Sequence, residues 1–203
     1  MTVLRPPFRQ ATPADAAVLA ELVNYAGEGM PLYLWERMAA PGETAWDVGR
    51  KRAARDTGSF SYRNAAVIEH DGRCAGALIG YAISAKPESI PSDMPPMFVP
   101  LQELENLAPS TWYVNVLAVL PELRNRNLGA QLLELADETG RSLGLRGMSV
   151  IVSDTNAGAR RLYERHGYRV MATRTKVKDG WQNDGKEWVL LTKELGGGFP
   201  SQR

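Results

Sequence analysis

The chain contains a single cysteine, Cys74, among its 203 residues. It therefore cannot form an internal disulfide, and its composition fits a reducing compartment, so we expect a cytoplasmic protein. Cys74 has no neighbouring pattern that would make it a nucleophile, and we expect a buried structural thiol. No cluster of His, Cys and carboxylate residues has metal-ligand spacing, so no metal is expected.

Long apolar runs and a strong net charge are missing as well. No apolar stretch reaches the roughly 20 residues that a transmembrane helix needs, and the first residues carry no signal-peptide core. A net charge of +1 gives no general attraction to nucleic acid or to a membrane surface, so any anion site must be local. The length predicts one domain over 1–195, followed by a flexible tail over 196–203.

Strand and helix signals alternate along the chain. The patterns predict strands at 8–11, 65–70, 73–84, 112–120, 148–152, 168–177 and 187–193. They predict helices at 12–26, 130–143 and 156–166, with one or two further helical pieces within 31–56. An irregular insertion is predicted over 85–110, which contains six prolines and is long enough to suggest a functional role.

The stretch 117–130 joins an apolar strand to an amphipathic helix. It reads Leu-Ala-Val-Leu-Pro-Glu-Leu-Arg-Asn-Arg-Asn-Leu-Gly-Ala, so a basic, amide-rich turn lies directly before the helix. A helix start leaves backbone N–H groups unpaired and carries a partial positive charge. Two arginines beside it predict a seat for a pyrophosphate. The alternative is an ordinary strand-to-helix turn that happens to be basic.

Two segments resemble the signatures of the GCN5-related N-acetyltransferases (GNAT). Arg124-Asn-Arg-Asn-Leu-Gly129 resembles the cofactor motif Gln/Arg-x-x-Gly-x-Gly/Ala, with Asn127 in place of its first glycine. Asn156-Ala-Gly-Ala-Arg-Arg-Leu-Tyr163-Glu-Arg-His-Gly167-Tyr168 is similar to the second signature, Asn-x-x-Ala-x-x-Leu-Tyr-x-x-x-Gly-Phe/Tyr. The resemblance covers about Trp112 to Val170.

The resemblance implies an α/β fold with a mixed, mostly antiparallel sheet of six or seven strands and helices on both faces. It also implies that the strands at 112–120 and 148–153 splay apart and form the slot for acetyl-CoA. Asparagine adopts a left-handed backbone more easily than most residues, so Asn127 is expected to keep the turn at a small strain cost. The cofactor-binding residues implied are Leu117, Ala118, Val119, Arg124, Asn125, Arg126, Asn127, Leu128, Gly129, Ala130, Asn156 and Tyr163.

The same resemblance implies that Tyr163 is the general acid that protonates the departing CoA thiolate. A phenol has a reference pKa near ~10 and is protonated at neutral pH, so it can donate a proton; the alternative is that Tyr163 only packs. Asn156 caps the helix, binds the pantetheine, or does both. Many relatives use a Glu on the fourth strand as base, whereas Asn115 stands there in this chain and is expected to orient a water.

The acceptor is expected to be a primary amine, with a small molecule favoured, bound by the N-terminal helices and the 85–110 insertion. Glu36, Glu103 and Glu105 suit a cationic amine. The last two are also alternative bases, although solvation at the surface is the favoured interpretation of each. An apolar acceptor wall is an interpretation for Tyr33, Trp35, Trp46 and Phe98, with core packing as the alternative.

Two other functions stay open: an acyl-CoA sensor or interaction module without catalysis, and a protein N-terminal or lysine acetyltransferase. The oligomeric state stays open too, with a homodimer as one option.

Overall fold

The computed structural model describes residues 4–196, in which seven strands form one mixed sheet. The strands are β1 (Phe8–Gln10), β2 (Ala65–His70), β3 (Arg73–Ala82), β4 (Thr111–Val119), β5 (Gly147–Ser153), β6 (Arg169–Thr175) and β7 (Glu187–Glu194). Their order in the sheet is β1-β2-β3-β4-β5-β7-β6. β4 and β5 run parallel, whereas β1–β2, β2–β3, β5–β7 and β6–β7 are antiparallel. The predicted α/β class and mostly antiparallel sheet are confirmed.

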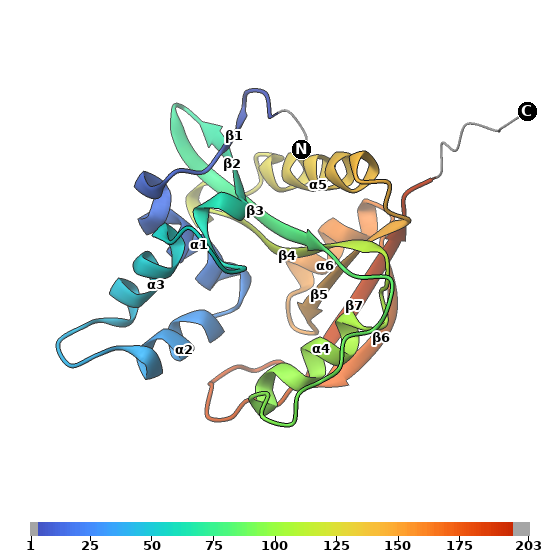
Figure 1. Cartoon of the computed structure of the whole chain (residues 1–203). Helices are drawn as coiled ribbons and strands as arrows, with labels where there is room; N and C mark the ends of the chain where they lie inside the picture. Colours follow the sequence, from blue (N-terminus) through green and yellow to red (C-terminus); the bar gives the residue numbers. More distant parts are fainter. Residues whose placement is uncertain (1–3, 197–203) are drawn as a thin grey trace, which may run out of the picture. The chain divides into compact units, whose positions relative to one another are not determined.

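Six α-helices accompany the sheet in the described part of the chain (Figure 1). They are α1 (Ala16–Ala26), α2 (Met30–Met38), α3 (Ala45–Ala54), α4 (Val99–Glu105), α5 (Leu128–Ser142) and α6 (Ala157–Arg165). Four short 3-10 turns, η1 to η4, lie at Pro13–Asp15, Tyr62–Asn64, Pro96–Phe98 and Pro121–Leu123. The helices and strands predicted from the periodicity are all present, with ends that shift by a few residues.

The chain divides into two compact units. The N-terminal unit comprises the chain up to Gly80 together with Asn115–Leu135, and the C-terminal unit comprises Tyr81–Val114 and the chain from Ala136 onward. The expectation of a single domain over 1–195 stays a prediction. Of the tail expected to be flexible, 197–203 lies outside the described residues.

In the N-terminal unit, α1, α2 and α3 pack against one another around aromatic side chains. The Trp35 ring stacks on Phe60 with 5.8 Å between centroids and meets Trp46 edge-on at 6.2 Å. A Cβ at Gly49 would lie 2.5 Å from the Trp35 ring, so α3 approaches α2 closely because this position has no side chain. Trp35 is 3% exposed and belongs to the hydrophobic core, so for this residue the packing alternative is correct.

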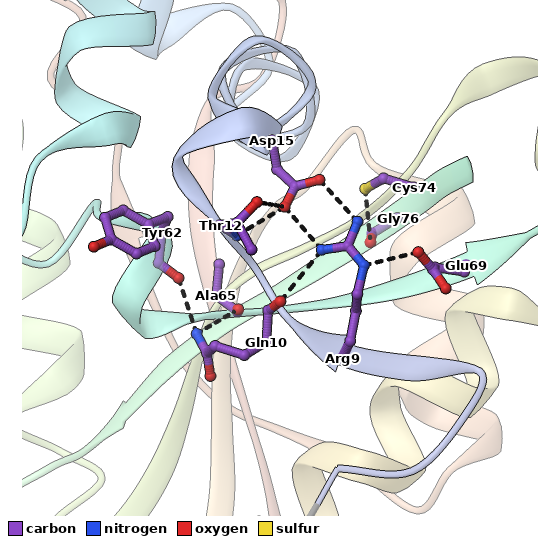
Figure 2. Close-up of polar contacts among 9 residues, drawn as sticks. All are labelled: Arg9, Gln10, Thr12, Asp15, Tyr62, Ala65, Glu69, Cys74 and Gly76. Atoms are coloured by element: carbon purple, nitrogen blue, oxygen red, sulfur yellow. Dashed lines mark hydrogen bonds and ion pairs between the residues drawn. The ribbon is translucent and has the colours of Figure 1, made fainter. Parts of the chain in front are cut away.

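A buried carboxylate ties β1 to the start of the helices in the same unit (Figure 2). Arg9 donates two hydrogen bonds to Asp15, at 2.8 and 2.9 Å, and one to Glu69 on β2, at 2.7 Å. Asp15 also accepts from the backbone and hydroxyl of Thr12, at 2.8 and 3.0 Å. The hydrogen bond from Arg9 outweighs burial and holds the pKa of Asp15 below its usual value.

The single cysteine lies beside this network and is half-buried instead of fully buried. Burial raises the pKa of the Cys74 thiol to about 11. The thiol therefore stays protonated at neutral pH, which agrees with the expected structural role.

In the C-terminal unit, α4 packs against β5, β6 and β7 (Figure 1). The prediction of an irregular insertion over 85–110 is wrong here, because η3 and α4 occupy 96–105. Pro96 and Pro100 stand at the first positions of these two helices, where a missing N–H costs nothing. The prolines therefore start helical structure in this segment. Leu104 of α4 is fully buried.

We expect Asp15→Asn to lower the free energy of unfolding at pH 7 by about 1–2 kcal/mol, because it removes the charge from hydrogen bonds that Arg9 donates. Solvent reaches the guanidinium, whose side chain is 35% exposed, and limits the loss. The folded-state pKa of Asp15 is lowered, so its contribution is complete above the unfolded pKa near ~3.8 and disappears as pH falls through the folded pKa.

Urea unfolding of wild type and Asp15→Asn at pH 7 and pH 3 measures this difference. Glu69→Gln is the control, because its carboxylate is more exposed and should cost less. Equal unfolding midpoints for wild type and Asp15→Asn at pH 7 would contradict the assignment.

Candidate functional site

The predicted site residues divide between the two units, and each group is built by its own elements. In the N-terminal unit they lie on the second half of β4, in the turn after it and at the start of α5. Asn115 is exposed, although both of its neighbours on the strand are buried, so the one polar residue of this apolar strand faces solvent. Ala118 and Val119 are buried, and a Cβ at Gly76 on β3 would lie 2.7 Å from the Ala118 carbonyl oxygen.

The turn between β4 and α5 has an unusual backbone. Asn125 and Asn127 both have left-handed conformations, with φ of 61° and 63°. Asparagine is one of the few non-glycine residues that tolerate this region. The Asn127 carbonyl accepts a hydrogen bond from the Gln131 N–H at 3.2 Å, so the helix starts directly after this residue. Asn127 thus supplies a left-handed backbone where the family motif has glycine.

The two arginines of the turn are exposed and are held by different neighbours. The Arg124 guanidinium donates from Nε to the Val119 carbonyl at 3.3 Å, and its central carbon lies 5.8 Å from the centre of the Tyr25 ring. Arg126 contacts His70, with 3.3 Å between Nη1 and Nε2. His70 is half-buried, and its Nε2 also lies 3.6 Å from Asp71 Oδ2. Two positive charges therefore flank the first turn of α5.

In the C-terminal unit, the second signature forms α6. The Asn156 side chain accepts a hydrogen bond from the Ala159 N–H at 3.1 Å, which confirms its role as helix N-cap. Tyr163 is 5% exposed, and its ring packs on Tyr168 with 5.5 Å between centroids. Burial raises the pKa of Tyr163 well above its ordinary value, so the phenol keeps its proton at physiological pH.

A buried lysine that the sequence patterns did not reveal joins the β6–β7 loop to the end of β5. Lys176 Nζ donates to Ser153 Oγ at 2.6 Å and to Asn183 Oδ1 at 2.9 Å. It lies 4.2 Å from the centre of the Trp188 ring, and Trp181 stacks on that ring. Because α6 begins shortly after Ser153, this contact holds the chain where it leads from β5 into α6. A lysine between strand residues gives no signal of burial in the sequence.

The structure separates the carboxylates expected near the acceptor. Glu103 accepts a hydrogen bond at 2.6 Å from Arg174 on β6, which makes it part of an ion pair. Glu105 lies two residues further along α4 and instead accepts a hydrogen bond from the Tyr81 hydroxyl at 3.0 Å. Glu36 is exposed on α2 in the other unit. The sequence treats Glu103 and Glu105 alike, and only the packing of α4 distinguishes them.

Metal-ligand clusters are absent from residues 4–196, and no helix within that range is long and apolar enough to cross a membrane. The candidate residues of the N-terminal unit are backbone N–H groups and arginines, and those of the C-terminal unit are tyrosines and carboxylates. These groups can bind a phosphate-bearing ligand and can donate or accept protons.

Residues 31–168 match the sequence profile of the acetyltransferase (GNAT) family. Among curated proteins, no sequence matches the chain.

Several solved structures share the fold. One is an acetyltransferase with 22% identity and a TM-score of 0.63, aligned over 93% of this chain and 98% of the other. A second is an N-acetyltransferase from Staphylococcus aureus Mu50, with 20% identity, a TM-score of 0.64, and 91% and 98% of the two chains covered. A third, a GNAT acetyltransferase from Streptococcus pneumoniae, has 20% identity, a TM-score of 0.53, and 93% and 98% coverage.

At these identities the structural likeness concerns the fold, and the match of the family profile extends over more than half of the chain. Both signature segments that pointed to the family lie on the elements predicted for them, at the start of α5 and along α6. The chain therefore belongs to the GNAT acetyltransferase family.

Proposed function

We propose that this protein transfers an acetyl group from acetyl-CoA to a primary amine by direct attack within a ternary complex. A small-molecule amine is the favoured acceptor. The observation that carries the proposal is the turn before α5, in which Asn127 takes the left-handed backbone of the motif glycine. Together with family membership, this turn argues that the cofactor-binding function is retained. We place the reaction in the cytoplasm on the grounds of the single cysteine.

The residues around the turn fit a pyrophosphate. The first N–H groups of α5 have no partner within the helix, and the helix dipole favours an anion there. Arg124 and Arg126 are exposed on either side and supply charge-assisted hydrogen bonds. In this proposal the pantetheine arm pairs with the backbone of 117–119 and with Asn156.

When bound, acetyl-CoA supplies an activated acetyl thioester, and the protein residues handle the charges and protons. The backbone N–H groups of 117–119 stabilise the negative charge that develops on the carbonyl oxygen. Tyr163 gives its phenolic proton to the departing thiolate. The phenol still holds this proton at neutral pH because burial raises the pKa of Tyr163. Asn115, which cannot act as a base, orients a water.

Binding of acetyl-CoA should depend on the backbone of Asn127. We expect wild type to bind acetyl-CoA, Asn127→Gly to bind it equally well, and Asn127→Val to bind it at least about tenfold more weakly. A left-handed backbone costs a β-branched residue about 1–2 kcal/mol or more, whereas it carries no steric cost for glycine. Calorimetric titration measures the affinities.

Glu134→Val is the matched control, because it places the same side chain at an exposed position of the same helix, away from its start. This variant should bind as wild type does. No binding of acetyl-CoA to folded wild type would overturn the proposed function and leave a family member with another role.

Catalysis should depend on the phenolic proton of Tyr163. We expect Tyr163→Phe to lower kcat by about 10²-fold or more while the affinity for acetyl-CoA stays unchanged, because the ring still packs on Tyr168. Release of free CoA thiol in the presence of primary amines measures kcat. Wild-type turnover in Tyr163→Phe would assign Tyr163 to packing, and binding without thiol release in wild type would favour the sensor alternative.

A further inference from the structure

Two tyrosines and one carboxylate meet at the edge of the C-terminal unit. Tyr81 is the last residue but one of β3, and its hydroxyl donates to Glu105 Oε2 at 3.0 Å. The Tyr81 ring packs on Tyr113 of β4 with 5.3 Å between centroids and a tilt of 56°. Tyr113 is 5% exposed, whereas Tyr81 is 37% exposed. The group therefore has a buried side and a side that a ligand can reach.

Glu105 differs from the other carboxylate of α4 in its partner. Glu103 forms an ion pair with Arg174, whose positive charge compensates the negative charge of the carboxylate. Glu105 accepts from a neutral hydroxyl, and a carboxylate can accept about four hydrogen bonds, so it keeps capacity for a cationic donor. A carboxylate with aromatic rings beside it suits an ammonium group, which the ring faces also attract.

The surroundings of Glu105 also favour proton uptake. Burial is the main cause that raises its pKa above the ordinary value, and the nearby negative charge of Glu88 adds to this. The hydrogen bond from Tyr81 acts in the opposite direction. Glu88 is held by Asn106, which accepts from its N–H at 2.9 Å and donates to its carbonyl at 2.8 Å. A base whose pKa lies closer to neutral is better matched to proton transfer.

Tyr113 is a buried electrostatic neighbour of both Glu105 and the proposed general acid. Its buried phenol interacts electrostatically with Glu105, with Tyr81 and with Tyr163, all within the same unit. Together with burial, these neighbours hold the pKa of Tyr113 well above its ordinary value, so Tyr113 stays neutral. Tyr113 is therefore a neutral residue near enough to feel the charge of both the Glu105 carboxylate and the Tyr163 phenol.

We propose that Glu105 is the residue that binds the ammonium group of the acceptor, against the Tyr81 ring, and accepts its proton. This inference rests on the proposed acetyl transfer and names the base and the charge of its substrate. The acceptor class is then a primary amine that arrives as a cation.

The proton balance of the step is complete. The ammonium gives one proton to the Glu105 carboxylate and becomes a neutral amine, whose lone pair forms the new C–N bond as the C–S bond breaks. The thiolate takes the phenolic proton of Tyr163, and the second proton that the nitrogen loses passes through solvent to Tyr163 and restores its phenol. The products are the amide, free CoA thiol and one proton that Glu105 returns to solvent.

Glu105→Gln and Glu103→Gln form a matched pair, because both neutralise a carboxylate on the same helix. Acetyl transfer to benzylamine, tyramine and 1,4-diaminobutane is followed as thiol release, and benzylamine affinity is measured by calorimetry. We expect Glu105→Gln to lower kcat/KM by about 10²-fold or more, to weaken benzylamine binding, and to leave acetyl-CoA affinity unchanged. Glu103→Gln should keep all three values near those of wild type.

The pH profile separates chemistry from structure. In wild type, kcat/KM should rise with pH as Glu105 loses its proton, at a higher pH than for an exposed glutamate. The charged and titratable neighbours are Tyr81, Glu88 and Tyr113, while Arg174 is occupied by Glu103. Tyr81→Phe removes the hydrogen bond that lowers the Glu105 pKa and should move this limb upward. Glu105→Gln should abolish it.

Equal kcat/KM in Glu105→Gln and Glu103→Gln, or an unmoved limb in Tyr81→Phe, would overturn the assignment. Turnover of none of the three amines by wild type would overturn it too, since a primary ammonium site should accept at least one. In each case, retained binding of acetyl-CoA shows that only the role of Glu105 has failed. Lost binding of acetyl-CoA by wild type would instead refute the proposed function.

Discussion

The abrupt start of α5 is the constraint on which the proposed cofactor binding depends. β4 must end and a helix must begin within a few residues, and the chain achieves this with left-handed backbones at Asn125 and Asn127. Because asparagine tolerates this geometry, the loss of the motif glycine does not cost the helix start its position. This turn sets where the first N–H groups of α5 and the two arginines lie, and these groups form the proposed binding site for the pyrophosphate.

In the C-terminal unit, removal from water is the main cause that raises the pKa values of Tyr163, Glu105 and Tyr113. The same burial that raises the pKa of Tyr163 keeps a proton available for donation, and at Glu105 it increases affinity for a proton. Tyr113, which both groups influence, stays neutral as well. In the proposed mechanism, burial therefore prepares both the acid and the base, and neither a metal nor a histidine takes part.

The sequence predicted elements where residue periodicity agrees with clear start and stop signals, such as the strands at 65–70 and 73–84 and the amphipathic helix α5. It failed at α4, because prolines that open a helix look like those of a loop. Pairings between distant segments were also invisible: Lys176 with Ser153, and Arg9 with Asp15. Glu103 and Glu105 could not be told apart, because their partners come from β6 and β3 and only tertiary packing brings these strands to α4.

The most direct test of the proposed reaction follows the acetyl group itself. Acetyl-CoA with a deuterated acetyl group is incubated with the protein and benzylamine, and small molecules and intact protein are analysed by mass spectrometry. Direct transfer predicts deuterated N-benzylacetamide and an equal amount of free CoA, with no label on the protein while the reaction runs. Label that accumulates on the protein before the amide forms would contradict direct attack, and acetyl-CoA that stays intact would contradict acetyl transfer.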